Sequence, residues 1–221
     1  MNKLSTLTLA AAALAATGTL VAQQQPPRPM MAPASKDPAA AATGSYMLDS
    51  RHASVIARIA HGGGTSFSTF RFDAVSGSLD WNGAKPESSK VSIKVDPKSI
   101  NSPVAGFAAE LAGERYLNVA KFPTASFVST SIKRTGPTTG VITGDLTLMG
   151  VTKPVTVTAN LVGAGKGMRG NAVAGFSGST KFKRSDFGFT AMMGPIGDEV
   201  ELIIDLEFGM PAPAAPAAPK P

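Results

Sequence analysis

Two histidines, His52 and His61, are the side chains of this sequence best suited to acid–base or metal chemistry. Imidazole titrates near neutral pH and commonly binds metals. Their odd spacing places them on opposite faces of an extended strand unless a bulge intervenes. Asp49 stands close to His52, but a zinc site needs three or four ligands. We predict no metal, and two roles stay open: a structural hydrogen bond to a neighbouring strand, or a polar contact with a ligand headgroup.

Ser185 and Asp186 follow Arg184, a combination that could indicate nucleophilic catalysis. A serine nucleophile needs a base within hydrogen-bond reach and an oxyanion pocket. The sequence has no Gly-x-Ser-x-Gly elbow before a helix at this point. The segment instead predicts a turn pinned by an Arg184–Asp186 ion pair, with Phe187 and Phe189 packed inward. We therefore predict that the protein is not an enzyme and carries no cofactor.

Cysteine usage and charge exclude further classes of function. The chain has no cysteine, which rules out disulfides, thiolate chemistry, cysteine-ligated zinc and iron–sulfur clusters. Its net charge of +6 is scattered, and Lys181 and Lys183 alternate with Phe182 so that both point to solvent. Nucleic-acid binders gather their cations on one face beside stacking aromatics. We predict no nucleic-acid partner and only a weak, transient attraction to anionic membrane surfaces.

The ends of the chain differ in composition from its middle. Residues 1–22 combine Lys3, an apolar run rich in Ala and Thr, and a small residue at Ala22, which predicts a cleaved export signal rather than a membrane anchor. We therefore expect the protein in the periplasm or secreted. Residues 23–43 and 211–221 are rich in Pro and Ala and predict extended, hydrated tethers. One domain remains, at residues 44–210.

Polar and apolar residues alternate through this domain, a pattern typical of antiparallel strands with one dry face. About eight strands result, a number at which a closed barrel can hold one small ligand. They are expected over residues 47–61, 66–79, 88–95, 125–134, 141–149, 155–161, 168–183 and 199–208. Closure removes exposed edges, although a two-sheet sandwich satisfies the same alternation. The fold class is all-β.

One segment breaks the alternation. Between Pro103 and Val119, Phe107, Leu111 and Tyr116 recur near helical spacing. One or two short helices should cross one end of the barrel. Two interpretations stay open: a plug that fills the end, or a lid over the mouth of a ligand site.

Residues 146–155 and 183–188 resemble the signature of the YceI-like family of secreted lipid-binding barrels. Further matching pieces follow the family's order: 46–52, His61 with its trailing glycines, 76–79 and 115–123. The resemblance implies a lipocalin-like barrel that binds a long-chain polyisoprenoid or a similar lipid outside the cytoplasm. Met149 departs from the polar or basic residue of many relatives and favours a less polar ligand.

We expect the ligand to lie along the dry face of the strands and beneath the helical segment. The residues expected to line the lumen or its mouth are His52, His61, Val91, Ile93, Phe107, Leu111, Phe127, Leu146, Leu148, Val157, Ala159, Leu161, Phe176, Met192, Leu202 and Ile204. The protein should act as a monomer or dimer.

The rival interpretation is a structural or interaction protein whose barrel is filled by its own side chains. Small residues on the dry face favour the hollow barrel: Ala57, Ala125, Ala159, Ala174 and Gly178. An enzyme acting on a bound lipid is a third and less favoured interpretation.

Overall fold

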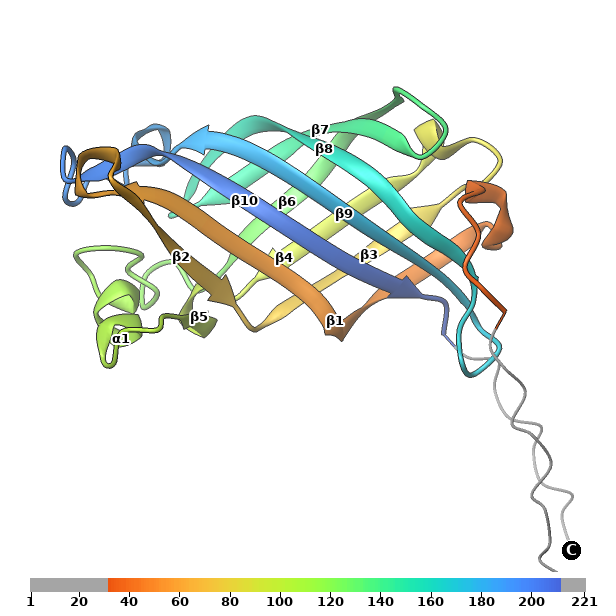
Figure 1. The fold of residues 1–221 in the computed structure, drawn as a ribbon, viewed down its shortest axis with the longest axis horizontal. Helices are drawn as coiled ribbons and strands as arrows, with labels where there is room; N and C mark the ends of the chain where they lie inside the picture. The colour runs from red at the N-terminus through yellow and green to blue at the C-terminus, as the bar shows by residue number, and fades with distance from the viewer. Residues whose placement is uncertain (1–31, 212–221) are drawn as a thin grey trace, which may run out of the picture. The chain divides into compact units, whose positions relative to one another are not determined.

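The computed structural model describes residues 32–211, in which antiparallel strands dominate (Figure 1). The strands are β1 (Gly44–His61), β2 (Ser66–Phe72), β3 (Val75–Trp81), β4 (Lys90–Val95), β5 (Ile100–Asn101), β6 (Ala125–Arg134), β7 (Thr139–Leu148), β8 (Val151–Lys166), β9 (Ala172–Lys183) and β10 (Ile196–Gly209). The helix α1 spans Phe107–Ala112. Short 3-10 turns lie at Pro38–Ala40, Gly62–Gly64, Pro86–Ser88, Pro97–Ser99 and Arg184–Phe187. Within residues 32–211 no helix has the length and apolar content needed to cross a bilayer.

The sheet closes on itself. Its strand order is β10-β9-β8-β7-β6-β4-β3-β1, and β1 pairs again with β10, so that eight strands form a closed antiparallel barrel. β2 and the two-residue β5 continue the sheet beyond the second half of β1. The predicted all-β barrel is confirmed, and the sandwich is excluded.

The expected single strand over residues 66–79 is wrong, because it consists of two strands. β3 pairs with the start of β1 and β2 with its end. At the break, the backbone N–H groups of Asp73 and Ala74 donate to the carbonyl and the hydroxyl of Ser99 instead of to β1. Because of this interruption, the long strand β1 pairs with β3 along its first part and with β2 along its second part.

A bulge in β1 decides which of its residues face inward. Between Leu48 and Ala53, four residues of β1 stand opposite the single residue Glu207 of β10. Such an irregularity shifts the alternation of the strand by an odd number of positions. Tyr46 and Leu48 face the interior before the bulge, and Val55 and Ile59 face it afterwards.

The short helical segment predicted between Pro103 and Val119 is confirmed as one helix. α1 begins after Gly106, whose φ of +78° suits glycine, and no side chain caps it. Gly113 ends the helix after six residues. Irregular chain follows up to β6. A buried apolar cluster holds this region together and consists of Ile100, Leu111, Tyr116 and Leu117.

The opposite end of the barrel is closed by the segment before β1, drawn in orange in Figure 1. Ser35 and Ala164 exchange two backbone hydrogen bonds of 2.8 Å, and Ala41 is buried. The expectation of a hydrated tether up to residue 43 is therefore wrong for residues 35–41, because they pack on the barrel. The expected signal at residues 1–22, the first part of the linker and most of the tail lie outside the described residues.

Candidate ligand-binding cavity

A cavity of about 600 Å³ runs between the two ends of the barrel. This volume lies within the range of about 300–1,000 Å³ that is typical of small-molecule sites. Apolar side chains from β1, β2, β4 and β6–β10 make up most of its wall. The residues placed there as expected are His61, Val91, Ile93, Phe107, Leu111, Phe127, Leu146, Leu148, Val157, Ala159, Leu161, Phe176, Met192, Leu202 and Ile204.

Small residues from three strands lie side by side in the cavity wall. Ala159 of β8 pairs with Gly140 of β7 on one side and with Gly178 of β9 on the other. All three contribute to the cavity wall. Ala57 and Ala125 also line it, whereas Ala174 is fully buried in the core and does not. The cavity of about 600 Å³, which these small residues help to line, distinguishes this barrel from one filled by its own side chains.

Aromatic side chains form a floor at the end closed by residues 35–41. The Phe176 ring stands edge-on to Trp81, with centroids 5.4 Å apart, and edge-on to Phe208 at 6.2 Å. The Trp81 indole N–H donates to the carbonyl of Pro38 at 3.3 Å. Beside them, the buried Tyr46 hydroxyl donates to the carbonyl of Ala42, and burial raises the pKa of this phenol. The floor is thus held by ring packing and by bonds to the covering segment.

At the other end, α1 and the β9–β10 loop form a cover made mainly of side-chain contacts. Phe107 of α1 meets Phe70 of β2 at 6.1 Å. Arg115 contacts the sulfur of Met192 at 3.6 Å. His61 and Met192 line the cavity here and remain exposed to solvent, and Val104 beside them is 61% exposed. Exposed residues thus line the cavity at this end, as Arg134, Pro137 and Thr139 of the β6–β7 turn do beside the floor.

Arg184 organises the β9–β10 loop. It is only 1% exposed, and its guanidinium donates to backbone carbonyls of Phe189, Ala191, Ile196 and Gly197. Burial lowers the pKa of Arg184, and the nearby charge of Asp198 partly offsets this. The fork of donors on the guanidinium thus joins four backbone carbonyls of the loop.

The predicted Arg184–Asp186 ion pair is wrong, because the structure gives Arg184 carbonyl partners and leaves Asp186 exposed. Asp198 of β10 instead accepts hydrogen bonds from the backbone N–H and hydroxyl of Ser185, at 2.9 and 2.8 Å. These bonds hold the pKa of Asp198 below its usual value, the backbone bond having the largest effect. Ser185 thus has a structural partner in the Asp198 carboxylate. The predicted inward packing of Phe187 and Phe189 is confirmed.

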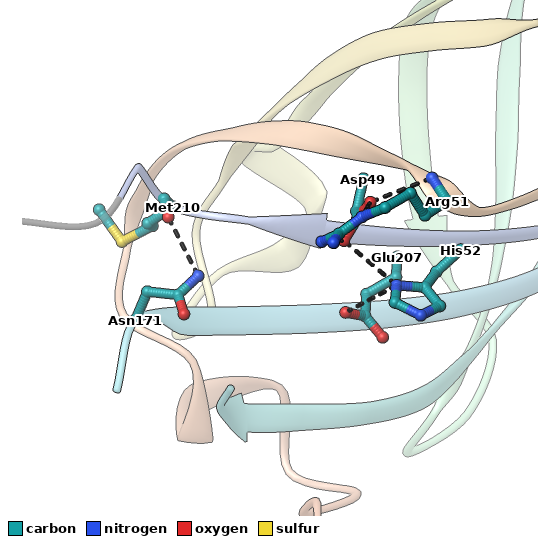
Figure 2. Close-up of polar contacts among 6 residues, drawn as sticks. All are labelled: Asp49, Arg51, His52, Asn171, Glu207 and Met210. Atoms are coloured by element: carbon teal, nitrogen blue, oxygen red, sulfur yellow. Dashed lines mark hydrogen bonds and ion pairs between the residues drawn. The ribbon is translucent and has the colours of Figure 1, made fainter. Parts of the chain in front are cut away.

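His52 does not line the cavity, contrary to the expectation. It lies in the β1 bulge on the outer surface, where its Nδ1 is 3.1 Å from Oδ2 of Asp49 and 4.0 Å from Oε1 of Glu207 (Figure 2). Donor atoms of these three residues lie within 4.8 Å of one another. Arg51, however, donates to both carboxylate oxygens of Asp49, at 3.0 and 2.8 Å, and this bonding lowers the pKa of that carboxyl. A cation would have to displace the guanidinium, so the cluster stabilises the bulge without needing a metal.

Figure 2 also shows how the chain is held where β10 ends. The Asn171 amide donates to the carbonyl of Met210 at 3.1 Å. The backbone N–H of Met210 donates in turn to the carbonyl of Ala172. The turn before β9 therefore fixes the last described residues of the domain to the barrel.

Several wall residues were not among the expected ones, notably Phe70, Trp81, Phe182 and Arg184. The alternation of Ser68, Phe70 and Phe72, and of Leu79 and Trp81, carries the signal for the aromatic ones. Arg184 offered no such signal, since a cation next to a turn usually faces solvent.

Comparison with known proteins identifies the family. The model of the YceI-like domain matches residues 46–208. The chain belongs to the YceI-like family. Its relatives include UPF0312 proteins of Azotobacter vinelandii, 45% identical over 73% of this chain and 85% of that protein, and of Ectopseudomonas mendocina, 42% identical over the same shares.

Solved structures share the barrel of this YceI-like chain. BcnA of Burkholderia cenocepacia superposes with a TM-score of 0.65 at 22% identity, over 72% of this chain and 98% of that one. A YceI protein of Campylobacter jejuni gives 0.58 at 27% identity, over 64% and 84%. A polyisoprenoid-binding domain from Saccharophagus degradans gives 0.56 at 14% identity, over 75% and 98%.

Proposed function

We propose that this YceI-like protein binds a long-chain polyisoprenoid, or a similar lipid with a small polar end, inside its barrel, and that it carries or sequesters this lipid outside the cytoplasm. The observation that carries the proposal is the hollow, apolar cavity of about 600 Å³. The Saccharophagus degradans domain, named for polyisoprenoid binding, supports the same ligand class.

The chemistry of the wall favours a ligand recognised by its apolar length. Each buried methylene contributes about 0.8 kcal/mol, whereas association costs roughly 4–15 kcal/mol. A tail of about ten carbons would therefore barely bind, and one of about twenty would bind tightly. The wall residues of β4, β7, β8 and β10 are aliphatic at almost every inward position, so they offer contact area and little headgroup recognition.

The polar groups of the described residues favour binding without catalysis. No buried side-chain nitrogen or oxygen within residues 32–211 lacks a hydrogen-bond partner. Arg184 and Ser185, the best candidates for chemistry near the cavity, are engaged by carbonyls and by Asp198. We therefore propose a non-enzymatic role without a cofactor. The proposed partner is the lipid itself, for a monomeric or dimeric protein that meets anionic membranes transiently and does not bind nucleic acid.

Mass spectrometry of an organic extract from natively purified protein tests the proposal. We expect a long-chain isoprenoid or comparable lipid at about one molecule per chain. Bound ligand stabilises the native state by about 2.7 kcal/mol at a hundredfold excess over Kd, so the extracted protein should melt at a lower temperature and recover when the lipid returns. A lipid-free extract, together with a melting curve that no chain length changes, would contradict the proposal.

A further inference from the structure

The cavity has two unlike ends, and this asymmetry has a consequence for the length of the ligand. We propose that the aromatic floor acts as a ruler: Phe176, held between Trp81 and Phe208, stops the inserted tail and sets the longest tail the barrel encloses. The inference rests on the proposed lipid binding and adds to it a residue that determines specificity.

The floor is fixed from both sides. Phe176 makes edge-on contacts with Trp81 and Phe208, and Phe208 is only 2% exposed. The bond from Trp81 to Pro38 and the Ser35–Ala164 pairing hold the covering segment beside these rings, where Pro38 also lines the cavity. Moving the floor would break these bonds together, and a well-packed core resists such displacement.

At the other end, α1 has no backbone pairing of this kind with the barrel, although β5 just before it pairs with β2 and Pro195 of the β9–β10 loop accepts a backbone hydrogen bond from Gly63. α1 has no capping side chain; its Phe107 contacts Phe70 of β2, whereas Arg115 contacts Met192 within the cover itself. A lipid that enters here goes in tail first, because the wall beyond the cover is apolar. Its tail then extends past Ala159 until it meets Phe176, the next inward residue of β9 after Gly178.

The cavity volume sets the scale of the ruler. At about 30 Å³ per heavy atom, the share of one water molecule in the liquid, the cavity of about 600 Å³ holds about twenty heavy atoms. Carbons beyond that number would stay outside the cover and gain no burial. Affinity should therefore rise with tail length and then level off.

The experiment titrates lipid-free protein with isoprenoid alcohols from about ten to about forty carbons. Below the limit, each added methylene should raise the affinity about fourfold, which corresponds to about 0.8 kcal/mol. Near about twenty carbons the affinity should reach a plateau. Trp81, the only tryptophan of the chain, lies on the floor, so its fluorescence should respond only to tails that reach the plateau length.

Substitutions of Phe176 should move the plateau in both directions. Phe176→Ala should shift it to tails longer by about one isoprene unit, because the ring it removes contains about as many carbons. Phe176→Leu should shift it less and covers the case in which the alanine variant fails to fold. Phe176→Trp should shift it to shorter tails. Phe67→Ala removes an outward-facing ring that is 55% exposed and should leave the plateau unchanged.

Three outcomes separate the ruler from the proposed function. Plateau shifts in opposite directions for the smaller and larger residues support the ruler. A plateau that is the same in Phe176→Leu, Phe176→Trp and wild type, or affinity that rises without a plateau, would overturn the ruler and leave lipid binding intact. Absence of binding at every tail length would overturn both.

Discussion

The two ends of this barrel are closed by different means. At one end, residues 35–41 pair with β8 through two backbone hydrogen bonds and accept a bond from Trp81. At the other end, a six-residue helix without a side-chain cap contacts β2 through the Phe107 and Phe70 rings and packs on a buried apolar cluster. A helix this short gains little stability of its own. Regions held by few backbone bonds open first, so we expect the α1 end to open before the floor.

The largest expected effect separates the two ends by removing one phenyl ring from each. Phe208→Ala should lower the free energy of unfolding by about 3–5 kcal/mol, the usual cost of emptying a fully buried ring site. Phe107→Ala loses mainly its contact with Phe70, worth about 1 kcal/mol, and should speed lipid release about fivefold. Urea unfolding and stopped-flow lipid release measure the two quantities. Equal destabilisation by both substitutions would show that the ends are equally fixed.

Arg184→Met should destabilise the loop that completes the α1 end. The substitution leaves four carbonyls without their charged donor, and each unsatisfied buried group costs about 1–3 kcal/mol. Partial rescue by water should reduce the total to about 3 kcal/mol, measured as a shift of the urea midpoint. Arg71→Met removes an exposed ion pair with Asp73 and should cost at most about 1 kcal/mol. If both variants behave alike, Arg184 does not organise the loop.

Truncation tests the fixed end. A chain that begins at Gly44 loses the Ser35–Ala164 pairing, the carbonyl partners of Trp81 and Tyr46, and the bond from Lys36 to Val162, five hydrogen bonds worth about 1 kcal/mol each. Its melting temperature should fall by about 10–20 °C. A chain that begins at Ala32 keeps these contacts and is the control. Equal melting temperatures for the two chains would mean that residues 35–41 do not stabilise the barrel.

The smallest expected effect is a pH-dependent change in the stability that Asp198 contributes. Because hydrogen bonds from Ser185 lower the folded-state pKa of Asp198, this carboxylate contributes stability above its unfolded pKa of about 3.9. The contribution is lost as the pH falls from there through the lowered folded-state pKa. Asp198→Asn should therefore be less stable than wild type at neutral pH, and the difference should shrink below about pH 4. Denaturant midpoints across pH measure it, and a difference that grows in acid would contradict the assignment.

The sequence predicted the barrel and most of its wall because strict alternation leaves only one face for Val157, Ala159 and Leu161. It misplaced His52, because alternation cannot show a bulge that sets four residues against one. It also missed that residues 35–41 pack on the barrel, since their Pro-rich composition is that of a tether and the contacts are with distant strands. The partners of Arg184 are likewise backbone carbonyls that only the folded loop brings together.

The most direct test of a hollow, lipid-binding barrel compares two neighbouring substitutions in β8. Ala159→Trp places an indole in the cavity beside Gly140 and Gly178, whereas Thr158→Trp places it on the exposed face. Calorimetric titration of each lipid-free variant with a long-chain isoprenoid alcohol, alongside a urea midpoint, measures binding and folding separately. We predict that Ala159→Trp loses binding with little loss of stability and that Thr158→Trp binds as wild type does. Retained binding by Ala159→Trp, or a loss of stability of about 1–3 kcal/mol from overpacking, would contradict the hollow barrel.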